Sequence, residues 1–170
     1  MSWHTSAVLI GVDRASRIVE LLEELGFSGA QQLDSISFDE ATSVGGFDGS
    51  LTVAVATVDG WTSLWGPFLT ADQKAMELIS KEGPVLTLML EGSSGTYAFE
   101  YFRDGSRVRA RMEQGGEVLS EEGGPLPEEL EASRDSRTGE QTLLKLMEKL
   151  TIPFDRLPGV DYKVYELPSG

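Results

Sequence analysis

The chain has 170 residues, 40% of them hydrophobic, and it contains no cysteine. A chain of this length fits one domain with a substantial core, and the missing thiols exclude disulfides, cysteine-bound zinc, iron–sulfur clusters and cysteine nucleophiles. Acidic residues outnumber basic ones by 28 to 14, a net charge of −14 that disfavours direct contact with nucleic acid or with anionic membranes.

The N-terminal segment predicts a buried strand followed by an amphipathic helix. Residues 7–12 form a continuous apolar run, which is typical of a central strand covered on both faces. The run ends at Asp13 and is too short for a signal peptide or a membrane span, so we expect a cytoplasmic protein. Apolar residues then recur with helical spacing from Ile18 to Leu25, and Gly26 stands where a helix C-cap is favoured.

The middle of the chain predicts three further strands, the last two joined by a tight turn, followed by a helix. Residues 31–36 and 51–58 have strand-like composition, and Asp59-Gly60 favours a hairpin into residues 61–65. Residues 70–83 contain a capping box and end in Gly-Pro, which predicts a second helix.

Two tryptophans lie on the second strand of this hairpin. Trp61 and Trp65 are four residues apart, so an extended chain places both on one face. There they would form an aromatic surface for a partner, or they would pack into the core.

Residues 85–113 predict a meander of three strands, with Asp104-Gly105 as the turn between the last two. A two-residue turn pairs Arg103 with Ser106 and Tyr101 with Val108. Three aromatic residues of the second strand, Tyr97, Phe99 and Tyr101, then share a core face with Val108, and the opposite face, which includes Phe102, meets solvent.

Three arginines are predicted on that solvent face, namely Arg107, Arg109 and Arg111. Guanidinium groups bind carboxylate or phosphate through paired hydrogen bonds, so this stripe is a candidate binding surface. In the alternative interpretation, the arginines pair with Glu100 and with nearby acidic residues and only keep the sheet polar.

The segment that follows is the most acidic in the chain. Residues 113–131 contain seven acidic residues and no basic one, and we predict an acidic loop at residues 113–137. Four glutamates are candidate contacts to a basic partner: Glu121, Glu122, Glu128 and Glu129. A solvated charge run without a partner is the alternative.

Leu143 to Leu150 has helical spacing, and the residues from Val160 to Val164 alternate as a last strand. Hairpins dominate the middle of the chain, and no regular alternation of strand and helix persists. The order predicts a single α+β domain over residues 1–170, a mainly antiparallel sheet with about three helices packed on it.

The sequence contains no familiar catalytic, metal-binding or cofactor-binding pattern. His4 is the single histidine, and no nucleophile elbow, phosphate-binding loop, dinucleotide fingerprint or EF-hand occurs. We therefore predict no catalytic residues, no metal and no cofactor, and lean against an enzyme.

The last two-thirds of the chain carry a resemblance. It involves Gly60-Trp61-Thr62, the strand pair of residues 97–111, Gly-Pro-Leu-Pro-Glu-Glu at residues 124–129 and the closing helix of residues 140–150. This arrangement resembles small bacterial domains of unknown function, common in actinobacteria, some of which are suspected of immunity or antitoxin roles. The resemblance implies no catalytic residues.

We expect a non-enzymatic interaction protein, in its specific form an immunity-like or antitoxin-like inhibitor of a basic protein. One alternative is a small-molecule-binding protein or an enzyme with an unrecognised site of carboxylates, arginine and tyrosine, which predicts a concave pocket near Trp61 or the arginine stripe. A second alternative is a structural subunit, which predicts a stable oligomer with a large apolar interface.

Overall fold

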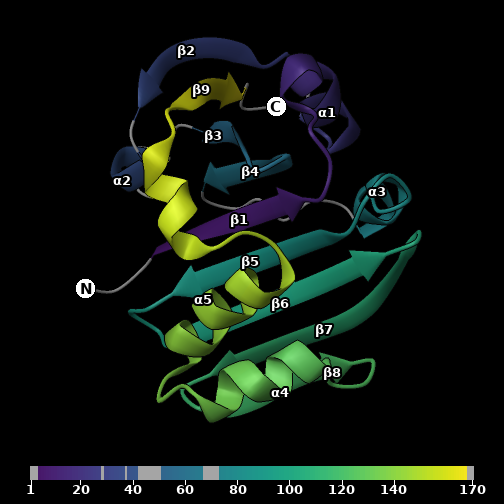
Figure 1. Cartoon of the computed structure of the whole chain (residues 1–170), viewed down its shortest axis with the longest axis vertical. Helices are drawn as coiled ribbons and strands as arrows, with labels where there is room; N and C mark the ends of the chain where they lie inside the picture. Colours follow the sequence, from purple (N-terminus) through teal and green to yellow (C-terminus); the bar gives the residue numbers. More distant parts are fainter. Residues whose placement is uncertain (1–3, 28, 37, 42–50, 67–72, 168–170) are drawn as a thin grey trace.

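The computed structural model describes residues 4–27, 29–36, 38–41, 51–66 and 73–167 (Figure 1). In these residues nine strands form one sheet in the order β2-β9-β3-β4-β1-β5-β6-β7-β8, and neighbouring strands are antiparallel. The strands are β1 (His4–Ile10), β2 (Gln31–Ile36), β3 (Leu51–Val58), β4 (Trp61–Gly66), β5 (Val85–Glu91), β6 (Thr96–Arg103), β7 (Ser106–Gln114), β8 (Glu117–Glu122) and β9 (Tyr162–Leu167). The predicted antiparallel sheet with packed helices is confirmed.

Helices cover both faces of the sheet. One core contains side chains of α2 (Phe38–Ala41), α4 (Pro127–Arg134), α5 (Gly139–Leu150) and the 3-10 helix η2 (Phe154–Gly159). The second core, on the opposite face, contains side chains of α1 (Ile18–Glu24) and α3 (Gln73–Ile79). A 3-10 turn, η1 (Ala15–Arg17), precedes α1. The prediction of about three helices was too low, because α2 is a single turn and α4 has few apolar residues.

The central position of β1 explains its continuous apolar sequence. Ala7 and Leu9 belong to the first core, whereas Val8 and Ile10 belong to the second. Successive side chains of a strand point to opposite faces, so a strand between two helical layers needs apolar residues at both odd and even positions. The predicted buried strand is confirmed. No helix in the described part of the chain is long and apolar enough to cross a membrane.

Both predicted Asp-Gly turns are present. The φ angles are 49° and 82° at Asp59 and Gly60, and 55° and 85° at Asp104 and Gly105. Two consecutive residues in the left-handed region match the tight hairpin turns that fit the twist of paired strands. Arg103 pairs with Ser106 as predicted.

Beyond the second turn, the predicted register is wrong. A bulge lies between β6 and β7, so that Phe102 pairs with Arg107 while Tyr101 pairs with Arg109. The extra residue is Val108, and a shift of one residue moves every later side chain to the other face. Arg109 and Arg111 therefore lie on the face covered by α4 and α5, and Arg107 lies on the opposite face.

The predicted acidic loop at residues 113–137 is also wrong. A turn at Gly115-Gly116 leads into β8, which pairs with β7 as the last strand of the sheet order. Helix α4 then packs against α5. The chain folds here because Arg109 provides a buried positive charge for its carboxylates, as described next.

Candidate functional site

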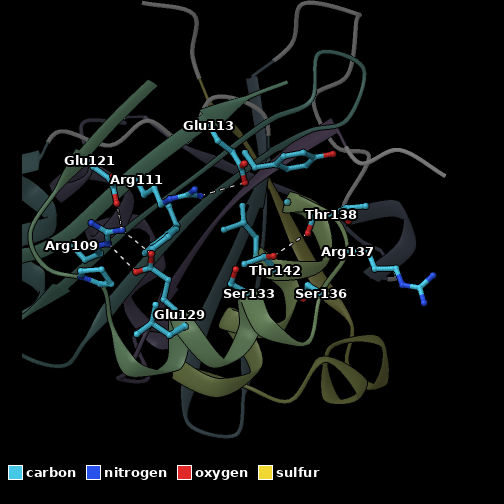
Figure 2. A pocket seen from close by; sticks show the side chains of 16 residues that line it. Arg109, Arg111, Glu113, Glu121, Glu129, Ser133, Ser136, Arg137, Thr138 and Thr142 are labelled. Carbon is cyan, nitrogen blue, oxygen red and sulfur yellow. Dashed lines mark hydrogen bonds and ion pairs between the residues drawn. The ribbon is translucent and has the colours of Figure 1, made fainter. Parts of the chain in front are cut away.

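The acidic end of the molecule, defined as β8 and α4 (residues 117–134), is built around Arg109. This side chain is only 1% exposed. Its Nε and Nη2 donate to the two carboxylate oxygens of Glu129 at 2.9 and 2.7 Å, and Nη2 also donates to Glu121 at 2.7 Å. Its Nη1 donates to the carbonyl oxygen of Gly123 at 2.9 Å. One buried guanidinium thus attaches both β8 and α4 to β7 (Figure 2).

The neighbouring glutamates stabilise the positive charge of Arg109. The hydrogen bond that Arg109 donates to Glu129 is the main cause that raises the pKa of Arg109, and burial opposes it. The hydrogen bond from Arg109 lowers the pKa of Glu121. Glu129 also accepts the backbone N–H of Leu126 at 3.1 Å, which satisfies a free donor at the start of α4. Gly123 has a φ of 78°, and a Cβ there would overlap the carbonyl oxygen of Val108.

Arg107 makes a separate ion-pair cluster on the opposite face of the sheet. Its Nη1 donates to Glu100 at 2.8 Å, and its Nη2 donates to Glu122. The hydrogen bond to Glu100 is the main cause that raises the pKa of Arg107. The predicted stripe of three arginines on one solvent face is therefore wrong, and the alternative interpretation, arginines paired with neighbouring carboxylates, is correct for Arg107 and Arg109.

Arg111 and Glu113 lie beside the N-terminus of α5. Arg111 Nη1 is 3.4 Å from Glu113 Oε1. An ideal Cβ on Gly139, the first residue of α5, would lie 2.6 Å from the same Glu113 oxygen. A carboxylate near a helix N-terminus is favourable, so the chain places its own anion where an anionic ligand would otherwise bind.

A groove of about 380 Å³ separates β7 and β8 from the two helices (Figure 2). Its lining is mostly polar and includes both charge signs and several hydroxyl groups. Examples are Tyr97, Arg111, Glu113, Ser133 and Thr138. Burial, together with Glu140, Glu113 and Glu91, raises the pKa of Tyr97. The small-molecule alternative predicted a pocket near the arginines, and this groove matches that description.

Strand β8 borders the groove and is exposed along its whole length. It carries three glutamates, and its apolar residues Val118 and Leu119 are 47% and 54% exposed. The sequence allows a short strand near Val118, and β8 confirms it, although the charge of the segment favours a loop. The signal for the full strand is the Gly-Gly turn followed by Val118 and Leu119.

The tryptophans lie far from this end of the sheet order. Both pack on the first core, which confirms that they share a face. Trp65 is fully buried, donates to Ser63 Oγ at 2.7 Å and contacts Phe38 edge-on at 5.3 Å between ring centres. Trp61 is half-buried. Core packing, the other arrangement predicted for the tryptophans, is confirmed for Trp65, which therefore offers no surface to a partner.

Among the described residues, no group of three or more histidine, aspartate or glutamate side chains could hold a metal ion. The chain matches no protein-family model, no curated protein and no solved structure.

Proposed function

We propose that this protein binds a basic protein through its acidic end. The observation that carries the proposal is the arrangement of charge there: all three glutamates of β8 are exposed, whereas Arg109 is buried. Glu117, Glu121 and Glu122 are exposed on β8, whereas Arg109 is buried and bonds to Glu121 and to Glu129 of α4. A basic partner would therefore meet carboxylates first.

The net charge strengthens such an interaction at a distance. An excess of 14 negative charges on 170 residues accelerates encounter with a positively charged surface, and added salt weakens this attraction. More specifically, we propose that the protein is an immunity-like or antitoxin-like inhibitor that covers a basic surface of its target.

The structure indicates which glutamates should be tested. Glu121 and Glu129 hold Arg109 in place, so replacing them would disturb the fold. Glu117, Glu122 and Glu128 are better choices, because none of them bonds to Arg109. Glu122 pairs with Arg107, but Arg107 keeps its bond to Glu100 when Glu122 is replaced.

The experiment is capture of basic proteins from a lysate of the source organism on the immobilised protein, at low and at high salt. We expect the triple variant Glu117→Gln, Glu122→Gln, Glu128→Gln to capture at least about tenfold less at low salt, the equivalent of about 1.4 kcal/mol. The matched control removes three exposed charges outside the acidic end, two on α1 and one on β9: Glu20→Gln, Glu23→Gln, Glu166→Gln. Equal losses in both triple variants would show that net charge alone acts and would contradict the proposal.

The groove supports a second candidate function, the binding of a small polar molecule. The supporting observation is the convergence of Tyr97, Arg111 and several hydroxyl groups on one concavity. Thermal-shift screening with small carboxylates, sugars and amino acids tests it. A ligand that raises the melting temperature of the wild-type protein but not of Tyr97→Phe or Arg111→Gln would support this function, and the absence of any shift would contradict it.

A further inference from the structure

The free edge of β8 suggests how a partner would be held. Strand β8 is the last strand of the sheet order, and no strand in the described part of the chain pairs with its outer edge (Figure 1). All six of its residues are exposed. An edge strand with open backbone groups is a template for one more strand.

The turn before β8 establishes which backbone groups point outward. Gly115 and Gly116 form a two-residue turn with φ angles of 58° and 86°, and Gln114 pairs with Glu117 across it. The residues that flank such a turn exchange both backbone hydrogen bonds, and antiparallel pairs alternate between bonded and non-bonded. Val118, the next residue, therefore directs its N–H and C=O toward the free edge.

The two faces of β8 differ in chemistry. Glu117, Ser120 and Glu122 pair with Gln114, Met112 and Ala110, so these three β8 residues share the face opposite α4 and α5. Val118 and Glu121 pair with Glu113 and Arg111 and lie on the other face, and Leu119 is the extra residue of a bulge in β8. An added strand places its side chains next to these two sets, so a complementary segment carries basic residues beside Glu117 and Glu122 and an apolar residue beside Val118.

The same charges argue against a second copy of this chain as the occupant. Pairing β8 with another β8 would bring the glutamates of both strands together, and like charges on neighbouring strands are destabilising. The glutamates thus disfavour self-association through this edge while favouring a basic strand.

We infer that β8 accepts an extended basic segment of a partner protein as an added antiparallel or parallel strand of the sheet. This inference rests on the proposed function and specifies its binding mode. Backbone hydrogen bonds to the outer edge of β8 supply affinity, and Glu117 and Glu122 select basic side chains.

The test uses a synthetic peptide as long as β8 that alternates lysine with valine, and its binding is measured by calorimetry. Val118→Pro removes the outward N–H at a position where an edge strand tolerates proline, whereas Val118→Thr keeps the N–H as a matched control. We expect the proline variant to bind at least about tenfold more weakly and the threonine variant to bind within about twofold of wild type. Glu117→Gln with Glu122→Gln should weaken binding and flatten its salt dependence.

Hydrogen exchange provides a second measurement that does not depend on the proline variant folding. In the wild-type protein, the bound peptide should slow exchange of the Val118 amide. An unchanged exchange rate overturns the inference, as does failure of the wild-type protein to bind the peptide at millimolar concentration. Self-association of the wild-type protein through β8 also overturns it.

The outcomes separate the binding mode from the proposed function. If the glutamine variants weaken binding but Val118→Pro does not, strand addition is wrong and charge-based recognition of a basic partner stands. If lysate capture does not depend on the acidic end, the proposed function is wrong even where the peptide binds.

Discussion

At the scale of single residues, Arg109 is the side chain whose loss we expect to cost most. Its removal would leave Glu129, 8% exposed, without its cation. Breaking a buried ion pair from one side typically costs about 3–5 kcal/mol, because the remaining charge is uncompensated. We expect Arg109→Ala to lower the free energy of unfolding by about this amount in urea denaturation. Arg109→Lys should restore only part of the loss, because lysine cannot make the paired bonds to Glu129.

Arg103→Ala is the control for this prediction. Arg103 is exposed beside the turn of the same hairpin. Surface substitutions of this kind usually change stability by less than about 0.5 kcal/mol. A loss below about 1 kcal/mol for Arg109→Ala would show that the acidic end contributes little to global stability.

Tyr162 leads to a prediction at alkaline pH. Its side chain is fully buried, and burial raises its pKa from 10.0 to about 12, while hydrogen bonds with Ser63 and Trp65 oppose the shift. The unfolded chain thus releases this proton at lower pH than the folded one. The contribution of protonated Tyr162 to the free energy of unfolding is fully present below pH 10. It is lost as the pH rises from 10 to 12, by roughly 1.4 kcal/mol per pH unit. Urea denaturation between these pH values should show the fall in the wild-type protein and a smaller fall in Tyr162→Phe. Equal slopes would contradict the assignment.

At the scale of elements, the sequence predicted well wherever local chemistry decides the structure. The apolar run of β1, the spacing of α1 and the two Asp-Gly turns each specify their conformation within a few residues. The register of β7 was not predictable in this way. Val108 is an ordinary strand residue, and nothing in its neighbourhood marks it as the extra residue of a bulge.

The acidic end shows a second limit of local reasoning. Helix α4 buries only Glu129 and Ala132, so it has no apolar stripe that predicts a helix. Its order depends on Arg109, which is 20 positions away from Glu129 in the sequence. The sequence allows pairing between the arginines and the acidic segment, but it does not identify Arg109 as the buried arginine that binds Glu121 and Glu129. Of the four candidate contacts, Glu121 and Glu129 therefore stabilise the fold, whereas Glu122 and Glu128 stay candidates for contact with a partner.

At the scale of the whole molecule, the net charge of −14 should act on folding and on binding in opposite directions. Excess charge of one sign repels itself more strongly in the compact state than in the unfolded chain. Salt screens this repulsion, since the Debye length falls from about 30 Å at 0.01 M to about 3 Å at 1 M. The buried pair of Arg109 and Glu129 is screened much less.

We therefore expect sodium chloride to raise the free energy of unfolding in urea while it weakens capture of a basic partner. Both quantities can be measured over the same series of salt concentrations, and urea is required because guanidinium chloride is itself a salt. If salt instead lowers stability, exposed ion pairs such as Arg107 with Glu122 outweigh the general repulsion. The acidic surface would then be explained by pairing within the chain, and the charge would no longer favour a partner.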